Sequence, residues 1–348
     1  MPARPPEWDP AFARAFNTLS LGELLGNPLD DSEYLPWDKL RFKTPPPEID
    51  HEQWWVMLKM RRNAQRRDVA LLDKAGTRFH YSLTDTVLKS CDVITQRASG
   101  EISLPELAVS AGDRDRYVVN SLIEEAITSS QLEGASTTRR VAKHMIRSGR
   151  SPATKSERMI LNNYRAMEMI RDWTDEPITP DRVLQLHRVV TLGTMDDPDE
   201  AGRLQTPDDI RIAVWGDGEQ LLHRPPNADE LPARLQALCD FANASGQDGP
   251  YIPVPVRAII VHFMVGYDHY FADGNGRTAR LLFYWCMLRN KYWLTEYVTI
   301  SRILKNAPSR YAASFLLSED DDGDLTQCEL ALAAKQSPET EERELGFD

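Results

Sequence analysis

The sequence has few of the features that mark secreted, membrane-bound or nucleic-acid-binding proteins. Its four cysteines lie far apart and include no Cys-x-x-Cys pair, which argues against a disulfide framework or a zinc site. No stretch reaches the roughly 18 consecutive apolar residues that a membrane-spanning helix requires. Residues 1–6 contain no apolar segment of the kind found in secretory signals. We therefore predict a cytoplasmic protein without membrane contact.

Positive charge is also scarce. The chain carries 53 acidic and 41 basic residues, and its formal net charge is −12. A protein with this balance repels nucleic acid unless basic side chains gather in one place. Two basic clusters occur, at residues 61–67 and 139–150, and we interpret each as the solvated face of a helix. No nucleic-acid partner is expected.

Helical periodicity dominates the sequence from Tyr117 onward. Apolar residues spaced three or four positions apart predict helices at about 117–134, 155–173, 180–193, 228–245 and 254–268, and a further helix begins near Gly276. Alternating apolar residues around Gly216-Asp217-Gly218 predict one short β-hairpin at about 210–222. The predicted fold class is therefore mainly α, a helical bundle with a single hairpin.

The first part of the chain has a different character. Residues 1 to about 50 are rich in proline and aromatics, which indicates an irregular arm. A helix is predicted over 52–75 and a short strand over 78–83. We predict an N-terminal accessory segment at 1–114, a core domain at 115–330 and a polar C-terminal tail at 331–348.

The strongest chemical signal lies between His269 and Arg280. Gly274, Asn275 and Gly276 come where the last predicted helix begins, and successive backbone N–H groups at such a position can bind an anion. Arg277 and Arg280 are three residues apart on that helix and share a face. Guanidinium groups suit phosphate oxygens because they donate two parallel hydrogen bonds.

Two further residues of this segment carry chemistry. Asp273 is a hard oxygen ligand that suits Mg²⁺ brought in on phosphates. His269, at the end of the preceding helix, can act as a base near neutral pH. An anion cradle, a metal ligand and a base are typical of phosphoryl and nucleotidyl transferases. The glycines also match a relaxed dinucleotide fingerprint, but the segment before them has helical rather than strand periodicity.

The segment resembles the signature of the Fic family, and the shared residues are His269-x-Phe271-x-Asp273-Gly274-Asn275-Gly276-Arg277-x-x-Arg280. The resemblance extends from about Tyr117 to Leu325. One departure is Tyr270, where the family usually has proline, and we expect it to alter the stiffness of the loop more than its chemistry. The resemblance implies a Fic-fold helical bundle and a protein adenylyltransferase. Such an enzyme moves AMP from ATP to a Ser, Thr or Tyr hydroxyl of a protein, which can be the enzyme itself, with Mg²⁺ as cofactor.

The same resemblance implies a role for each residue of the signature. His269 would accept the proton of the target hydroxyl, and Asp273 would hold Mg²⁺. Phe271 would anchor the loop in the core. The phosphate ligands would be Gly274, Asn275 and Gly276 for the α- and β-phosphates, Arg277 for the leaving diphosphate, and Arg280 for the γ-phosphate. His262, one heptad before His269, is interpreted as a packed histidine rather than a catalytic one.

A short motif upstream, Ser129-x-x-x-Glu133-Gly134, resembles the family's inhibition motif, Ser/Thr-x-x-x-Glu-Gly/Asn. Its position matches the class whose inhibitory helix, here about 117–134, precedes the catalytic core. A carboxylate at Glu133 that pairs with Arg280 would keep Arg280 from the γ-phosphate, so autoinhibition is predicted. The alternative is that Glu133 is a solvated residue at a helix end.

The predicted hairpin resembles the family's flap. Ile212 and Val214 would there offer an unpaired strand edge, to which a target segment adds as an extra strand. Two alternatives to AMP transfer remain open: a Fic enzyme that uses another nucleotide or mainly removes AMP, and a non-catalytic ATP-sensing module. A homodimer is common in the resembling class.

Overall fold

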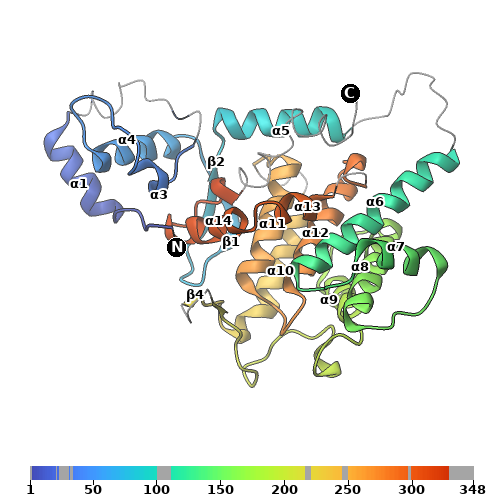
Figure 1. Cartoon of the computed structure of the whole chain (residues 1–348). Coiled ribbons are helices and arrows are strands. Elements are labelled where there is room, and N and C mark those ends of the chain that lie inside the picture. The colour runs from blue at the N-terminus through green and yellow to red at the C-terminus, as the bar shows by residue number, and fades with distance from the viewer. Residues whose placement is uncertain are drawn as a thin grey trace. The chain divides into compact units, whose positions relative to one another are not determined.

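The computed structural model describes residues 2–20, 22, 31, 34–99, 111–215, 221–244, 250–296 and 299–328 (Figure 1). Contacts divide the chain into two compact units: Met1–Asp92 with Ser309–Asp348, and Val93–Pro308. Helices dominate both, and the described strands form two two-stranded sheets. This confirms the predicted mainly α fold class. The predicted domain limits at 114 and 330 stay predictions, and the tail at 331–348 lies outside the described residues.

The first unit is built on a helix with a well-formed start. Asp50 accepts a hydrogen bond from the Gln53 backbone (2.8 Å), and the Gln53 side chain accepts one from the Asp50 backbone (2.8 Å). This capping box satisfies two backbone donors where α4 begins. The buried residues 54–58 of α4 pack with Ala11 and Ala15. The helices of this unit are α1 (Trp8–Thr18), α3 (Trp37–Leu40), α4 (His51–Asn63), the start of α5 (Asp85–Ala98) and α14 (Pro308–Asp320).

The helix predicted over 52–75 is wrong in its second half. Helix α4 ends at Asn63, and β1 (Arg66–Leu72) follows. β1 pairs antiparallel with β2 (Arg78–Ser82), which confirms the strand predicted over 78–83. Val69 and Leu71 are buried whereas their neighbours along β1 are exposed, so burial follows the two-residue period of a strand. Pairing with β2 decides the structure here.

The C-terminal part of the first unit closes onto β2. The His80 backbone N–H donates to Gly323 O (3.1 Å), and the Leu325 N–H donates to His80 O (2.8 Å). The Asp324 carboxylate accepts a hydrogen bond from the Tyr34 hydroxyl (2.5 Å). These contacts join segments more than 200 residues apart in the sequence into one unit.

The second unit is a bundle around two buried helices, α11 (Val254–Asp268) and α12 (Asn275–Arg289). Both are buried on nearly all sides, as expected for central helices. α11 packs against α12 and α10, and α12 packs against α6, α8 and α9 (Figure 1). The surrounding helices are α6 (Ala111–Leu132), α7 (Arg139–Ser148), α8 (Lys155–Asp172), α9 (Pro180–Thr191), α10 (Leu231–Asn243) and α13 (Ile300–Lys305). The predicted helices of this region are confirmed.

The predicted hairpin is present. β3 (Val214–Trp215) pairs antiparallel with β4 (Leu221–His223), and Val214 lies opposite His223. The predicted turn at 216–218 lies outside the described residues. Three 3₁₀ turns complete the unit: η1 (Pro198–Glu200), η2 (Ala228–Glu230) and η3 (Trp293–Glu296).

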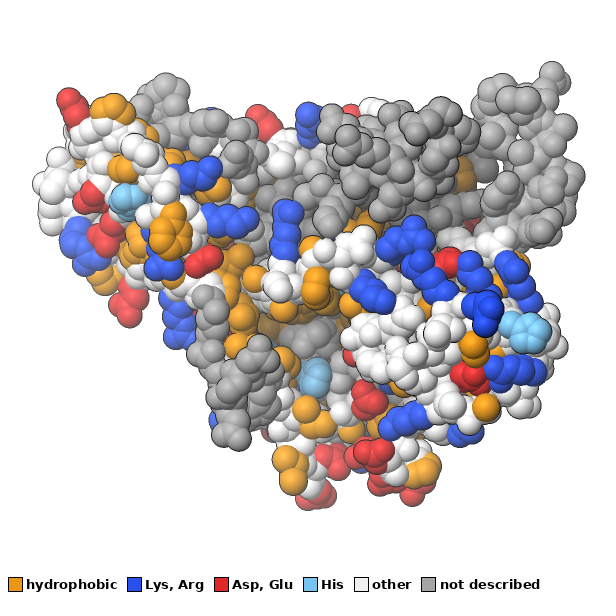
Figure 2. All heavy atoms as spheres, viewed as in Figure 1, with side chains coloured by type: hydrophobic (Ala, Val, Ile, Leu, Met, Phe, Trp, Pro, Cys, Tyr) orange, Lys and Arg blue, Asp and Glu red, His pale blue; other side chains and the backbone are white. Residues whose placement is uncertain are grey.

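Charge and hydropathy follow the expected surface pattern. Figure 2 shows Lys and Arg side chains gathered over α7, where Arg139, Arg140 and Arg147 occupy exposed positions. The basic cluster at 139–150 therefore lies largely on a solvated helix face, as predicted. None of the helices in the described ranges is both long and apolar enough to cross a bilayer.

Candidate active site

The loop between α11 and α12 is bounded by two residues in the left-handed conformation. His269, the C-cap of α11, has φ 48° and ψ 60°, and its N–H donates to Val265 O (3.1 Å). Gly274, at the N-cap of α12, has φ 82°. A side chain is strained at such an angle, and a Cβ on Gly274 would lie 2.7 Å from the Thr191 side chain. Position 274 therefore requires glycine.

Asn275 closes this loop with its side chain. Its Oδ1 accepts a hydrogen bond from the Phe271 N–H (3.0 Å), and its Nδ2 donates to Phe271 O (2.7 Å). Phe271 is fully buried, as predicted, and its ring stacks on His187 with centroids 3.7 Å apart. Both polar atoms of the Asn275 amide thus hold the loop's own backbone, and the predicted role of Asn275 as a phosphate ligand stays a prediction.

His187 on α9 supports the loop from outside, and no sequence motif marks it. Its Nδ1 accepts a hydrogen bond from the Gly202 N–H (2.9 Å), so its Nε2 carries the proton and donates to Asp273 O (2.8 Å). Burial lowers the pKa of His187 to about 4. The ring is therefore neutral at pH 7, and this hydrogen-bond arrangement is stable.

Arg277 is completely buried under the loop. Its Nη1 donates to Val190 O (3.0 Å), and its Nη2 lies 3.5 Å from Asp273 Oδ2. Its Nε has no hydrogen-bond partner among the described residues. Burial lowers the pKa of Arg277, and Asp273 opposes this effect. A buried guanidinium with spare hydrogen-bonding capacity fits an anion.

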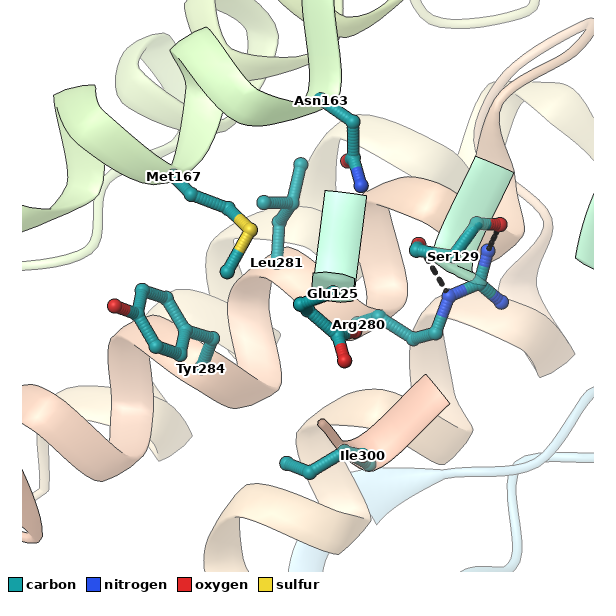
Figure 3. Close-up of a pocket in the computed structure, with 8 residues that line it drawn as sticks. All are labelled: Glu125, Ser129, Asn163, Met167, Arg280, Leu281, Tyr284 and Ile300. Atoms are coloured by element: carbon teal, nitrogen blue, oxygen red, sulfur yellow. Dashed lines mark hydrogen bonds between the residues drawn. The ribbon is translucent and has the colours of Figure 1, made fainter. Parts of the chain in front are cut away.

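Arg280, one turn further along α12, is held by the end of α6. Its Nε donates to Ser129 Oγ (2.8 Å), and its Nη2 donates to Ser129 O (3.0 Å) and Glu133 Oε1 (2.7 Å). Figure 3 shows the Arg280 side chain reaching Ser129. The structure therefore brings together Ser129, Glu133 and Arg280, the residues that the sequence predicted to interact.

The end of α6 explains how Glu133 reaches that arginine. Gly134 has φ 87°, its N–H donates to Gln131 O (3.2 Å), and the Ala135 N–H donates to Ser130 O (3.0 Å). This is a Schellman motif, and it leaves Glu133 as the last residue before the chain turns away. Gly134 is therefore the C′ residue of α6.

Glu133 also contacts the anion cradle directly. A Cβ built on Gly276 would lie only 2.2 Å from Glu133 Oε1. Gly276 lies inside α12 and is not among the glycines with positive φ, so its small size is what the site requires. The Glu133 carboxylate therefore rests on the first turn of α12, where backbone N–H groups and the helix dipole attract an anion.

A small cavity lies beside Arg280 (Figure 3). Its volume of about 10 Å³ has room for one water molecule and none for a nucleotide. On one side Glu125 accepts hydrogen bonds from the Ser301 N–H (3.0 Å) and hydroxyl, and burial raises the pKa of Glu125. Within the described residues, Asn163 Oδ1 and the Tyr284 hydroxyl have no partner, so they fit a bound water.

Asp273 is the residue of the loop best placed to hold a metal ion. Its side chain is 56% exposed, and one oxygen accepts the Gly274 N–H (2.6 Å). No group of three or more His, Cys, Asp or Glu side chains gathers at one point in the described part of the chain. One accessible carboxylate fits Mg²⁺, which takes only one or two protein carboxylates when phosphates supply its other ligands.

His269 lies next to the hairpin. Burial, then the charges of Arg211 and His223, lower the pKa of His269 to about 4, while the Ile212 backbone and Glu133 oppose this shift. His269 is therefore neutral at pH 7 and can accept a proton. His262, the second histidine of α11, is buried, and burial lowers its pKa to about 3. This is the packed histidine that the sequence predicted.

Arg211 joins the hairpin to the loop, and sequence reasoning missed it. Its guanidinium donates to Asp268 O (2.5 Å), His269 O (2.7 Å) and Pro226 O (2.8 Å). It thereby satisfies the last carbonyls of α11 from the strand side. Ile212 and Val214 are each 37% exposed beside it.

The comparisons with known proteins agree with this geometry. Residues 177–287 match the family model described as Fic/DOC family. "Protein adenylyltransferase Fic" of Nematostella vectensis is 36% identical over 108 residues, and "Protein adenylyltransferase fic-1" of Caenorhabditis elegans is 32% identical over 118 residues. These matches cover 31% and 34% of this chain and 22% and 20% of those relatives' own length.

Solved structures extend the likeness to most of the fold. A Fic family protein from Desulfovibrio desulfuricans superposes with a TM-score of 0.56 at 21% identity, covering 75% of this chain and 77% of that one. Fic-1 from C. elegans gives a TM-score of 0.53 at 21% identity, covering 75% and 71%. At this identity the likeness establishes the fold.

Proposed function

We propose that this chain is a protein adenylyltransferase of the Fic/DOC family, whose model matches residues 177–287. The observation that carries the proposal is the loop between α11 and α12. It sets a neutral histidine, an accessible carboxylate and a helix N-terminus with two arginines within twelve residues. The names of the curated relatives support the same activity.

In the proposed reaction, a protein hydroxyl attacks the α-phosphorus of ATP. The new bond joins the hydroxyl oxygen to phosphorus, the bond to the bridging oxygen breaks, and pyrophosphate leaves. The proton of the hydroxyl passes to the neutral imidazole of His269. The polyphosphate raises the proton affinity of that imidazole, because a nearby negative charge favours the cationic form.

The phosphates would lie on the first turn of α12. Backbone N–H groups at Gly274, Asn275 and Gly276 would hold the α- and β-phosphates, and Arg277 would hold the leaving diphosphate. Asp273 would hold Mg²⁺, which neutralises phosphate charge when bound. The unused Nε of Arg277 supports this assignment.

We further propose that Glu133 inhibits the enzyme. Its carboxylate pairs with Arg280 at 2.7 Å and lies against Gly276, so it occupies the place of an anion at the helix N-terminus. The γ-phosphate of ATP would have to displace it to reach Arg280. Unless it does, the α-phosphate is not held in line for attack.

A target segment would add to the exposed strand edge that carries Ile212 and Val214. It would present a Ser, Thr or Tyr hydroxyl to His269, and a second copy of this chain could serve as the target or as a dimer partner. The four cysteines lie far apart in the sequence and include no Cys-x-x-Cys pair, which supports a cytoplasmic setting for the reaction.

The test measures transfer of α-labelled AMP to protein in the presence of Mg²⁺. Glu133→Gly is expected to raise labelling about 5–150-fold over the wild type, the range of a typical coupling between two sites. Adding His269→Ala is expected to lower the labelling activity of Glu133→Gly about 10²–10⁴-fold. Glu133→Gln is the matched control for charge, because it keeps the side-chain shape, and it should give an intermediate gain.

The outcomes separate the two proposals. Equal labelling by wild type and Glu133→Gly would contradict autoinhibition alone. Labelling that survives His269→Ala would contradict the assigned base. Binding of ATP without labelling of any protein offered would favour the ATP-sensing module over the transferase.

A further inference from the structure

We propose that Asp268 and Tyr270, the two neighbours of His269, form with Arg234 a clamp that positions His269 for transfer. The proposal rests on the proposed adenylyltransferase function. It concerns positioning residues, because none of the three side chains has to touch the nucleotide or the target.

Hydrogen bonds to a single carboxylate build the clamp. The Tyr270 hydroxyl donates to Asp268 Oδ2 (2.6 Å), and Arg234 Nε donates to Asp268 Oδ1 (2.7 Å). Tyr270 and Asp268 are two residues apart, so their bond closes a short ring across His269. Arg234 reaches this ring from α10 and fixes it to the bundle.

Burial shields the hydrogen bonds of the clamp from water. Asp268 is 1% exposed and Tyr270 is not exposed at all, so neither side chain can exchange its partner for water. Burial raises the pKa of Asp268, and Arg234 and Tyr270 oppose this effect. Burial and Asp268 hold the pKa of Tyr270 well above its usual value, so its hydroxyl keeps its proton and donates. A buried carboxylate needs such donors, and losing one leaves an unpaired oxygen.

Hydrogen bonds from other segments also hold the backbone of residues 268–270. Arg211 donates to the carbonyls of Asp268 (2.5 Å) and His269 (2.7 Å), and the Gln205 N–H donates to Tyr270 O (3.0 Å). His269 has φ 48°, a left-handed angle that a residue with a side chain keeps only when its surroundings impose it. The clamp and these backbone bonds together impose it.

The clamp matters in this chain because residue 270 is tyrosine and not proline. Proline, the usual residue in the family that the signature resembles, would restrict φ at this position through its ring. Tyrosine imposes no such restriction. In this chain the bond from the Tyr270 hydroxyl to Asp268 supplies the restraint, and both partners lie next to His269 in the sequence.

The competing explanation is that Tyr270 only fills the core. Tyr270→Phe separates the two, because it keeps the ring and removes one oxygen atom. Asp268→Asn is the second variant, since an amide offers one acceptor oxygen in place of two and cannot serve both Tyr270 and Arg234. Tyr292→Phe is the matched control: it removes the hydroxyl that bonds Thr95 (2.9 Å), away from the loop.

All variants are made in the Glu133→Gly background, and transfer of labelled AMP is measured as kcat and as KM for ATP. Tyr270→Phe and Asp268→Asn are each expected to lower kcat about tenfold, because a base displaced by a fraction of an ångström is poorly aligned. KM for ATP should stay unchanged, since the phosphate ligands lie at 274–280. The double variant should be no slower than the slower single variant, because both break one unit. Tyr292→Phe should keep full kcat.

A second measurement does not depend on transfer. The imidazole of His269 is titrated by NMR in ATP-free protein, where Arg211 and His223 face it and Glu133 has been removed. Tyr270→Phe is expected to move the titration midpoint of His269 up toward the ordinary histidine value, because a loosened ring reaches water. Tyr292→Phe should leave the midpoint in place.

The two measurements test the proposed function and the clamp separately. If no protein is labelled by any variant, the proposed function fails while the titration still decides the clamp. An unchanged His269 midpoint in Tyr270→Phe, with unchanged kcat where transfer is seen, would overturn the clamp and leave Tyr270 as core packing. Equal losses of thermal stability in Tyr270→Phe and Tyr292→Phe would show that any difference in kcat is not a folding defect.

Discussion

Three histidines of the second unit have a lowered pKa for the same reason. Burial is the largest cause in each, and it lowers the pKa of His187 to about 4, of His262 to about 3 and of His269 to about 4. A buried imidazole avoids charge because the protein interior solvates the cation poorly. In the unfolded chain the same side chains titrate near the ordinary value of about 6.5.

From these lowered pKa values we predict that the folded protein loses stability in mild acid. Between pH 6.5 and about 4 the unfolded chain binds protons that the folded chain refuses, so the free energy of unfolding falls as the pH falls. Each histidine contributes on the order of 2 kcal/mol of this loss between pH 6.5 and 5. Urea unfolding at several pH values measures the slope, and His262→Gln should make it shallower. A slope that His262→Gln leaves unchanged would contradict the assignment.

At this scale the sequence predicts the contact between its two motifs. The pairing of Arg280 with Glu133 could be anticipated, because each residue belongs to a short motif. The support from His187 and Arg211 could not, since both lie over 50 residues from the loop and carry no local pattern. Nor does the sequence show why position 276 is glycine: Glu133 occupies the space that a Cβ would need there.

Among the elements, α6 carries the proposed inhibition. Its last turn holds Arg280 through Ser129 and Glu133. One turn earlier, Glu125 accepts two hydrogen bonds from Ser301 at the start of α13. Because Glu125 is partly buried, this second attachment is costly to break. The inhibitory turn is therefore held in place by a contact that is not part of the inhibition motif.

Weakening that attachment should partly release the inhibition. Ser301→Ala removes the hydroxyl that bonds Glu125, at a cost of about 1–3 kcal/mol for the oxygen left without a donor. We expect faster hydrogen exchange in the last turns of α6 and a several-fold rise in basal transfer of AMP. The control is Thr128→Val, which removes a hydroxyl that bonds only within α6, to Glu124 O (2.8 Å). Equal exchange rates in the two variants would show that the α13 contact does not hold the helix.

The elements themselves differ in how well periodicity predicts them. Periodicity predicts α11 and α12 because both are long and apolar, and alternation around glycines predicts the hairpin. It predicts a helix in place of β1, because Val69 and Leu71 continue an apolar pattern that begins in α4. Their partner strand lies across a turn, and a periodicity count within one segment does not include it.

On the scale of the molecule, the first unit is discontinuous in sequence. It joins Met1–Asp92 to Ser309–Asp348, and Asp324 links the two parts. Its carboxylate accepts hydrogen bonds from the Tyr34 hydroxyl (2.5 Å), the Thr326 N–H (3.0 Å) and the Thr326 hydroxyl (2.5 Å). No sequence pattern predicts the bond between Tyr34 and Asp324, because these residues are 290 positions apart.

Replacing Asp324 should therefore destabilise the first unit and leave the second unit intact. Asp324→Ala leaves three buried donors without an acceptor and should destabilise the first unit by about 2–4 kcal/mol. Hydrogen exchange followed by mass spectrometry should show lost protection in β1 and β2 and full protection in α11 and α12. The control is Glu52→Ala, which breaks an exposed pair with Arg14 and should change little. Equal loss of protection in both units would mean that they unfold together, so that a defect in the first unit would also open the loop that carries His269.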